Sequence, residues 1–346
     1  MIVQRLDWID ALKSILIIIV IWGHLIQYYS GETEFWENSI WEIIYSFHMP
    51  LFIFISGYFF KNKPNLIESL KTKAIQLLLP GLTCAIILYI KSSHLNNIQL
   101  IDIKHIFESA CMNLWYLKTL FICLLGGYIF FRFKVVSIIT FILFWLFIRS
   151  GLYDYIEINL IYTLFTAIGG GNGLFFLLPF FILGYCFHHY NVYIKIKKDI
   201  YLISFFIMWY ILMQFFNGLD TIYFASPKWF SNNTLFYEEI IRTIYRDSVA
   251  LFAILFLFIL FKKYYNSAYT NLTINKVFEE IGKNTLGIYI FQYLIIEMNL
   301  FNLPFLKICQ NPFICIIHSI LITLIFNQAV KYIQIYKRFS TLLIGG

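Results

Sequence analysis

Long apolar runs, separated by short polar segments, organise the sequence. Runs of about 15–20 apolar residues recur along nearly the whole chain, and about 20 helical residues cross a hydrocarbon layer of about 30 Å. Helices are the plausible spanning element because each satisfies its own backbone polar groups. We expect about ten transmembrane helices, near residues 12–30, 41–60, 74–90, 112–131, 135–149, 171–189, 199–217, 247–261, 285–302 and 312–330.

Positive charge predicts the orientation of these helices. With the N-terminus in the cytoplasm, most of the 26 Lys and Arg residues fall in cytoplasmic segments, as the positive-inside rule requires. The apolar run within residues 153–169 is too short to span, and an eleventh span there would place every later basic loop outside. We therefore predict an all-α polytopic protein with both ends in the cytoplasm. Its single transmembrane domain covers residues 5–334, and residues 335–346 form a cytoplasmic tail.

Composition supports a membrane protein and excludes several other classes. Hydrophobic residues make up 60% of the chain and charged residues only 13%, whereas a soluble domain carries roughly a quarter charged residues. The net charge of +7 is spread beside the spans and does not form a nucleic-acid-binding patch. The six cysteines contain no CxxC pair, so we expect neither a disulfide framework nor a zinc site.

One stripe of the first span is polar. Lys13 and His24 are about three turns apart, roughly 16 Å along the helix, and Asp10, Val20 and Gln27 share their face. Ionisable residues inside a bilayer are costly and therefore indicate a functional site. The stripe favours a polar site that opens to the cytoplasm. The alternative is a snorkelling lysine and a histidine that bonds a neighbouring helix.

Two further ionisable residues are predicted at the depth of His24. His48 lies about 10 Å below the outer surface in the second span, and Glu297 falls near the same level in the ninth. Two imidazoles and a carboxylate at one depth are suited to general base catalysis. Equal depth does not establish proximity, and for Glu297 a place near the outer interface is the alternative.

The second span and the loop after it each allow two interpretations. Ser56 and Gly57 either open the helix toward a cavity or let helices pack closely. The loop lysines either bind a phosphorylated cofactor or simply satisfy the positive-inside rule. These lysines are Lys61, Lys63, Lys71 and Lys73.

Several motifs together resemble the membrane acyltransferase-3 family. Asp10, Lys13 and His24 resemble its Arg/Lys-x10-His signature. The further motifs occur in order along nearly the whole chain, at residues 47–59 (FHMPLFIFISGYF), 113–118 (NLWYLK), 181–185 (FILGY) and 282–290 (GKNTLGIYI). Two positions depart from the pattern, because Lys13 stands where arginine is common and Gln292 where the last motif usually has histidine.

The resemblance implies an enzyme that moves an acyl group, usually acetyl, from cytoplasmic acetyl-CoA to a hydroxyl of a sugar. Acceptors in the family include surface polysaccharides, lipid-linked sugars and lipopolysaccharide units. Carried over by position, His24 is the catalytic histidine and Lys13 is the basic partner of the signature. Lys71 and Lys73 match the basic segment that, by this resemblance, holds the phosphates of coenzyme A.

The working hypothesis combines the stripe and the resemblance. His24 either deprotonates the sugar hydroxyl or briefly carries the acetyl group, with help from His48 and Glu297. Substrate-binding residues are expected at Asp10, Ser56, Trp115 and Tyr116, and either Trp115 or Tyr116 is expected to stack on the sugar. No metal is expected, and the partners are acyl-CoA, a sugar or polysaccharide and membrane lipid.

Two rivals remain at this stage. A permease or flippase for a glycan or lipid-linked sugar would line its pathway with the same stripe, and an inactive relative would act as a membrane partner or sensor. The Ile-, Asn-, Lys- and Phe-rich composition suggests an AT-rich bacterial genome, which places the protein in the bacterial inner (plasma) membrane.

Overall fold

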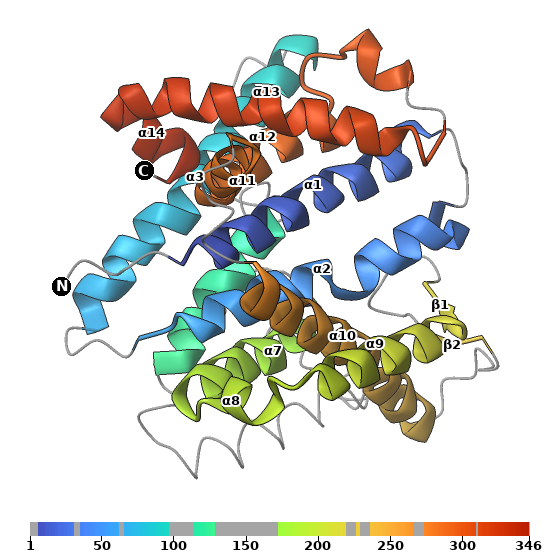
Figure 1. Cartoon of the computed structure of the whole chain (residues 1–346). Coiled ribbons are helices and arrows are strands. Elements are labelled where there is room, and N and C mark those ends of the chain that lie inside the picture. The colour runs from blue at the N-terminus through green and yellow to red at the C-terminus, as the bar shows by residue number, and fades with distance from the viewer. Residues whose placement is uncertain are drawn as a thin grey trace.

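The computed structural model describes a helical protein (Figure 1). The described residues are 6–30, 35–61, 66–96, 114–128, 172–218, 226–228, 236–265, 273–308 and 311–345. Their α-helices are α1 (Asp7–Tyr29), α2 (Ser39–Tyr58), α3 (Leu66–Asn96), a helix over 115–128, α7 (Asn172–His189), α8 (Val192–Ile196), α9 (Asp199–Met213), α10 (Phe236–Tyr264), α11 (Thr273–Lys283), α12 (Thr285–Gln292), α13 (Cys315–Ile335) and α14 (Lys337–Ile344). Shorter elements are η1 (Phe35–Glu37), η5 (Tyr293–Glu297), η6 (Pro304–Ile308) and the antiparallel strands β1 (Phe216–Asn217) and β2 (Ser226–Pro227).

Five of the described helices are long and apolar enough to cross a membrane. They are Asp7–Tyr29, Ser39–Tyr58, Ile67–Lys91, Ile240–Tyr264 and Cys315–Ile335. Three shorter apolar helices, Phe176–His189, Asp199–Met213 and Thr285–Glu297, fall at further predicted spans. The expected spans at 112–131 and 135–149 lie partly or wholly outside the described residues, as does the segment 153–169. The all-α class is confirmed, whereas ten spans and the cytoplasmic location of both ends stay predictions.

Helix α9 illustrates why a membrane suits this fold. Its side chains are almost all apolar, yet none of its residues is buried. Large residues such as Ile203, Phe206 and Tyr210 are exposed along it. A helix with this surface is stable where the surrounding medium is itself apolar.

Helix α1 lies in the middle of the molecule, with α13 on one side and α2 on the other (Figure 1). More than half of its residues are buried. Its side chains also bond distant segments, since Trp22 Nε1 donates to the Pro312 carbonyl at 2.6 Å and the Tyr29 hydroxyl to the Ile296 carbonyl at 2.9 Å. The polar stripe of α1 is therefore enclosed by helices from both ends of the sequence.

Helices α2 and α7 cross at two glycines. A Cβ atom on Gly57 would lie 1.9 Å from the Phe181 carbonyl oxygen, and one on Gly184 would lie 2.0 Å from the Phe54 carbonyl oxygen. Each position thus lies against the backbone of the other helix, as small residues allow in membrane proteins. Of the two interpretations of Ser56 and Gly57, the structure supports close packing for Gly57.

A third glycine explains how the late motif packs. A Cβ atom on Gly282, in the last turn of α11, would lie 1.8 Å from the Asp10 carbonyl oxygen of α1. Directly after it, the Asn284 side chain donates to Asn327 on α13 at 2.8 Å, and Asn327 donates to Glu280 at 2.7 Å. These contacts fix the junction from which α12 leaves toward His24.

The expectation about cysteines needs a correction. Cys315, the first residue of α13, is disulfide-bonded, and its partner lies outside the described residues. The spacing argument considered only CxxC pairs and did not predict this bond.

Candidate functional site

His24 opens into a cavity of about 220 Å³, here called the His24 cavity. Its lining side chains come from α1, α2, α7, α12, η1, η5 and the helix over 115–128. They are Val20, His24, Gln27, Tyr28, Phe35, Trp41, Tyr45, His48, Met49, Trp115, Phe176, Tyr289 and Glu297. An aromatic wall with a few convergent polar groups is typical of a site for a small organic ligand.

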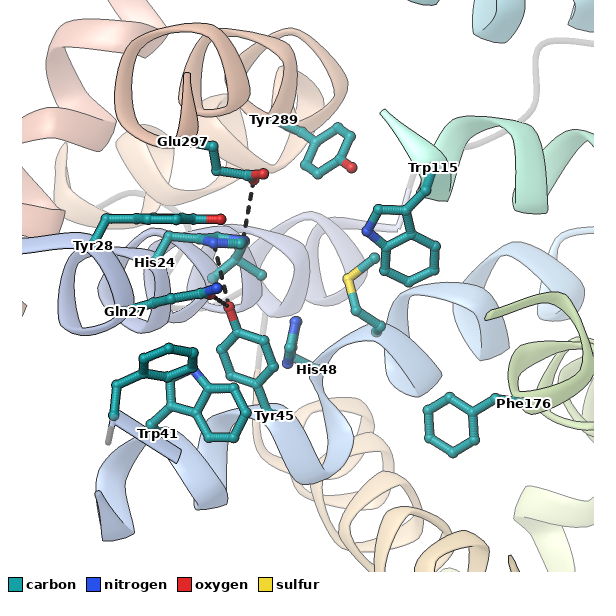
Figure 2. Close-up of a pocket in the computed structure, with 13 residues that line it drawn as sticks. His24, Gln27, Tyr28, Trp41, Tyr45, His48, Trp115, Phe176, Tyr289 and Glu297 are labelled. Atoms are coloured by element: carbon teal, nitrogen blue, oxygen red, sulfur yellow. Dashed lines mark hydrogen bonds and ion pairs between the residues drawn. The ribbon is translucent and has the colours of Figure 1, made fainter. Parts of the chain in front are cut away.

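The imidazole of His24 is held between α2 and η5, as Figure 2 shows. On one side, Nδ1 lies 3.3 Å from the Tyr45 hydroxyl, which itself donates to Gln27 Oε1 at 2.9 Å. Because that hydroxyl has only one proton, its oxygen is left to accept the Nδ1–H of His24. On the other side, Nε2 lies 3.4 Å from Oε1 of Glu297. The bonding therefore selects the tautomer whose Nε2 lone pair is available to take a proton.

Glu297 lies beside His24 in the cavity and not at a distant interface. The carboxylate also accepts a hydrogen bond from Gln292 Nε2 at 2.8 Å. The side chains of both His24 and Glu297 are 16% exposed, so the pair is largely shielded from solvent while still facing the cavity. The sequence predicted equal depth for His24 and Glu297, and the structure shows that the two side chains are also close together.

His48 lines the same cavity from α2. Its Nδ1 donates to the Ile44 carbonyl at 2.7 Å, which leaves Nε2 as an acceptor. The ring lies edge-on to Tyr45 at 4.7 Å between centroids. His48 is therefore close to the Tyr45 that orients His24.

Lys13 opens into a second cavity, of about 730 Å³, here called the Lys13 cavity. Its side chains come mainly from α1, α2, α3 and the helix over 115–128. They are Leu6, Ile9, Asp10, Lys13, Ile55, Ser56, Phe59, Phe60, Lys61, Ser69, Thr72, Lys73, Gln76, Leu77, Leu120, Leu124 and Tyr128. Three lysines face one carboxylate, so the cavity has an excess of positive charge.

Two of these lysines are oriented by neighbours. Lys13 Nζ lies 2.8 Å from Asp10 Oδ1, and Asp10 is buried. Lys73 Nζ donates to Gln76 Oε1 at 2.9 Å. A lysine ammonium group carries three N–H donors, and its charge strengthens hydrogen bonds to phosphate oxygens.

The two cavities share no lining residue, although both follow the stripe of α1. Tyr116 lies between them. Its hydroxyl is hydrogen-bonded to Ser56, which lines the Lys13 cavity, and its ring lies 5.8 Å from that of Tyr289, which lines the His24 cavity. Tyr116 thus contacts one lining residue of each cavity.

The predicted site residues divide between these places. His24, His48, Glu297 and Trp115 line the His24 cavity, whereas Asp10, Lys13, Ser56 and Lys73 line the Lys13 cavity. Tyr116 lines neither cavity, and the exposed Lys71 is also absent from both linings. Their roles as predicted from sequence are not tested by this placement.

Sequence reasoning missed the partners that orient the imidazole. Tyr45 precedes His48 by one helical turn on α2, so helical spacing alone placed both on one face. Trp41 is one further turn away, and its ring stacks on Tyr45 with centroids 4.0 Å apart. The chain has 25 tyrosines and 38 phenylalanines, and in such a background no single aromatic residue stood out.

Comparison with known proteins identifies the family of the chain. A family model described as an acyltransferase domain, that of the acyltransferase-3 family, matches residues 6–330. Nodulation protein NolL of Mesorhizobium japonicum is 43% identical over 90 residues, which is 24% of this chain and 24% of that protein. Nodulation protein NolL of Sinorhizobium fredii is 42% identical over 84 residues, or 22% of this chain and 23% of that protein.

These matches to relatives are local, because the chain spans about a quarter of the length of the curated relatives it matches. No solved structure matches the chain. The family model, in contrast, covers nearly the whole chain, including α1 with its stripe and both cavities. The resemblance noted from the motifs is thereby confirmed, and the chain belongs to the acyltransferase-3 family of membrane acyltransferases.

Proposed function

We propose that the protein transfers an acetyl group from cytoplasmic acetyl-CoA to a hydroxyl of a cell-surface or lipid-linked sugar, in the bacterial inner membrane. The observation that carries the proposal is the order of chemistry along one face of α1. A lysine-rich cavity lies at one end of the stripe, and the His24–Glu297 pair in an aromatic cavity lies at the other.

The Lys13 cavity supports an acyl-CoA as donor. Lys13, Lys61 and Lys73 supply positive charge for the phosphates of the coenzyme, while Lys71 lies outside the lining. Lys13 and His24 are separated by roughly 16 Å along α1. The pantetheine arm is long and flexible, so it suits a site whose charged end is wet and whose reactive end is deep.

The His24 cavity supports a sugar hydroxyl as acceptor. Trp41 and Tyr45 present stacked rings, and Trp115 lines the opposite wall (Figure 2). Aromatic faces pack against the C–H faces of a sugar ring, while the few polar groups fix its hydroxyls.

The transfer step follows from the bonding of His24. Nε2 takes the proton of the sugar hydroxyl as its oxygen attacks the thioester carbonyl. The carbon–sulfur bond breaks, and the leaving thiolate takes the proton from the imidazolium, so free coenzyme A and the acetyl ester are the products. Glu297 stabilises the imidazolium formed on the way, and Tyr45 keeps the ring in the required tautomer.

The test combines cells and purified protein. The acetyl content of surface glycans is measured by NMR in cells with the wild-type protein, a deletion and His24→Ala at matched membrane abundance. His318→Ala is the matched control, since His318 is only partly buried on α13 and lines neither cavity. Purified protein in liposomes is then supplied with acetyl-labelled acetyl-CoA and the glycan.

Loss of acetyl signals in the deletion and in His24→Ala, with glycan quantity and His318→Ala unchanged, is the expected result. Unchanged acetylation together with glycan that fails to reach the surface would overturn the proposal and identify a flippase. Transfer of label in liposomes from a donor other than acetyl-CoA would overturn the donor assignment alone.

A further inference from the structure

The helix that carries Glu297 changes its winding just before that residue. α12 ends at Gln292 and continues without a break into η5, a π-helical turn over Tyr293–Glu297. The Met298 amide bonds the Tyr293 carbonyl, five residues earlier, at 3.0 Å. Single π-helical turns inside α-helices are rare, and they occur frequently at functional sites.

The wider turn decides which side chains share a face. In an α-helix, residues five positions apart point about 140° away from each other. The π-helical turn instead brings Glu297 next to Gln292, whose Nε2 donates to Glu297 Oε1 at 2.8 Å. The hydrogen bond between these two residues therefore depends on the altered winding.

Two neighbouring helices hold this turn in place. The Tyr29 hydroxyl, at the end of α1, donates to the Ile296 carbonyl at 2.9 Å. Lys91 of α3 places Nζ 3.3 Å from the Met298 carbonyl and 3.2 Å from the Asn299 carbonyl, and a cation at a helix C-terminus is stabilising. Because α1 also carries His24, the turn and the imidazole are fixed relative to each other.

Gln292 bears on the proton of the His24–Glu297 pair. Nδ1–H of His24 is directed to Tyr45, so Nε2 is the nitrogen that faces Glu297 Oε1. The Gln292 N–H points at that same oxygen. A hydrogen-bond donor stabilises an ionised carboxylate over the neutral acid, so Gln292 favours an ionised Glu297 that leaves the Nε2 lone pair of His24 free and stabilises the imidazolium formed during transfer.

The amide oxygen of Gln292 has no comparable contact. The side chain is fully buried, and its Oε1 has no hydrogen-bond partner among the described residues. Gln292 does not line the His24 cavity, so it acts on a substrate only through Glu297. The N–H donor is the part of the side chain that the site employs.

We propose that Gln292 is a positioning residue that keeps Glu297 ionised and aimed at His24 while the imidazole accepts the proton of the acceptor hydroxyl. The inference rests on the proposed function, because it assigns a role within that acyl transfer. It also makes a claim about the resting protein, namely that Glu297 is ionised and the Nε2 lone pair of His24 is free.

Other titratable and charged groups surround the pair and are left unchanged by a substitution at Gln292. They are Tyr28 and Tyr29 on α1, Tyr45 and His48 on α2, Lys91 on α3, Tyr289 on α12 and Tyr293 on η5.

The first experiment measures acyl transfer against pH in liposomes for Gln292→Met and Gln292→Glu. The methionine has similar length and no donor, so we expect kcat to fall about 10- to 100-fold, with KM for acetyl-CoA unchanged because the Lys13 cavity is untouched. Gln334→Met is the matched control, since Gln334 donates to the Asn284 amide and lines neither cavity.

The glutamate variant separates a positioning role from a merely structural one. Two adjacent carboxyl groups share one proton over a wide pH range. While they share it, Glu at position 292 still donates to Glu297 and activity is retained. As pH rises and that proton is lost, the donor disappears and activity falls, which gives a new alkaline limb absent from the wild type and from Gln292→Met.

A second measurement needs no turnover. Diethylpyrocarbonate reacts with neutral imidazole, and the modification rate of His24 is followed by mass spectrometry in the resting protein. We expect a several-fold slower rate in Gln292→Met, because Glu297 then holds a proton and donates it to the Nε2 lone pair of His24, and an unchanged rate at His318.

The outcomes distinguish the two proposals. Unchanged kcat, pH profile and His24 modification rate in the Gln292 variants of an active enzyme overturn the role of Gln292 and leave the acyl transfer standing. A slower His24 modification in Gln292→Met, with no acyl transfer by the wild type, supports the positioning role and overturns the proposed function.

Discussion

The two cavities along α1 are built from the same helices and differ in chemistry. Helices α1 and α2 and the helix over 115–128 contribute side chains to both. The Lys13 cavity is larger and carries three lysines, whereas the His24 cavity is small, aromatic and holds a histidine–carboxylate pair. In the proposed function, one helix face serves binding at one end and proton transfer at the other. Substitutions at either end are expected to affect different kinetic constants.

The largest effect is expected at the glycine contact between α2 and α7, because α2 lines both cavities. Gly57→Ala would place a methyl group 1.9 Å from the Phe181 carbonyl oxygen, and a backbone clash is not relieved by a rotamer change. We expect a cost of about 3 kcal/mol or more and loss of most of the folded protein. Size-exclusion chromatography of the detergent-solubilised protein measures this. Gly81→Ala is the control, since among the described residues nothing lies within 4 Å of a Cβ there; equal yields of the two variants contradict the packing argument.

His24→Ala should abolish chemistry while sparing binding. Loss of the general base lowers kcat by about 1,000-fold, and the Kd for acetyl-CoA stays within about 2-fold because the Lys13 cavity is separate. Single-turnover transfer and calorimetric binding on the same preparation give the two constants. A large loss of acetyl-CoA affinity in this variant would show that the cavities do not act separately.

A pair of lysines on α3 tests the Lys13 cavity, at the opposite end of the stripe. Lys73 lines the Lys13 cavity, whereas Lys71, two residues earlier, does not. Removing a charge-assisted hydrogen bond to a phosphate raises KM for acetyl-CoA about 10-fold or more in Lys73→Ala, with kcat unchanged and Lys71→Ala near wild type. Steady-state kinetics in liposomes measures both. If Lys71→Ala has the larger effect, the phosphates bind outside the cavity.

Tyr45→Phe removes one hydrogen bond from His24 without changing ring packing on Trp41. The tautomer is then less strongly selected, and we expect kcat to fall about 2- to 10-fold, in line with one hydrogen bond, with KM for acetyl-CoA unchanged. Transfer rates at saturating acetyl-CoA give the comparison. A rise in KM for acetyl-CoA alone would show that Tyr45 contributes to binding of the donor and not to the transfer step.

The smallest effect is expected from salt. Raising ionic strength from about 50 mM to about 300 mM screens the lysine–phosphate attraction and should increase KM for acetyl-CoA a few-fold. The His24–Glu297 pair is largely shielded, so kcat should remain constant. A kcat that falls with salt while KM is steady would reverse the assignment of the two cavities.

Several features of the site were predictable because they depend on one helix. The spacing of Lys13 and His24 places them on one face of any α-helix, and the depth of His48 follows from its distance along the second span. The motif glycines at positions 57, 184 and 282 were visible in the sequence, but their role was not. Only the structure shows each of them against the backbone of another helix.

Glu297 marks the limit of this reasoning. Its approximate depth was predictable, whereas its partner was not, since a residue count assumes 3.6 residues per turn and η5 departs from that value. The contact with Gln292 arises from this departure and could not be found by helical spacing. The same holds for Tyr45, whose hydroxyl reaches His24 only because α1 and α2 pack as they do.

The sequence by itself determined that the chain is an all-helical membrane protein, which face of α1 is polar, and to which family its motifs belong, because hydropathy, helical periodicity and motif order are properties of a linear chain. The tertiary structure decided that the stripe serves two separate cavities, that Glu297 meets His24, and that Gln292 holds Glu297. These relations depend on how helices cross and on one turn of altered winding, and both are set by contacts between residues far apart in the chain.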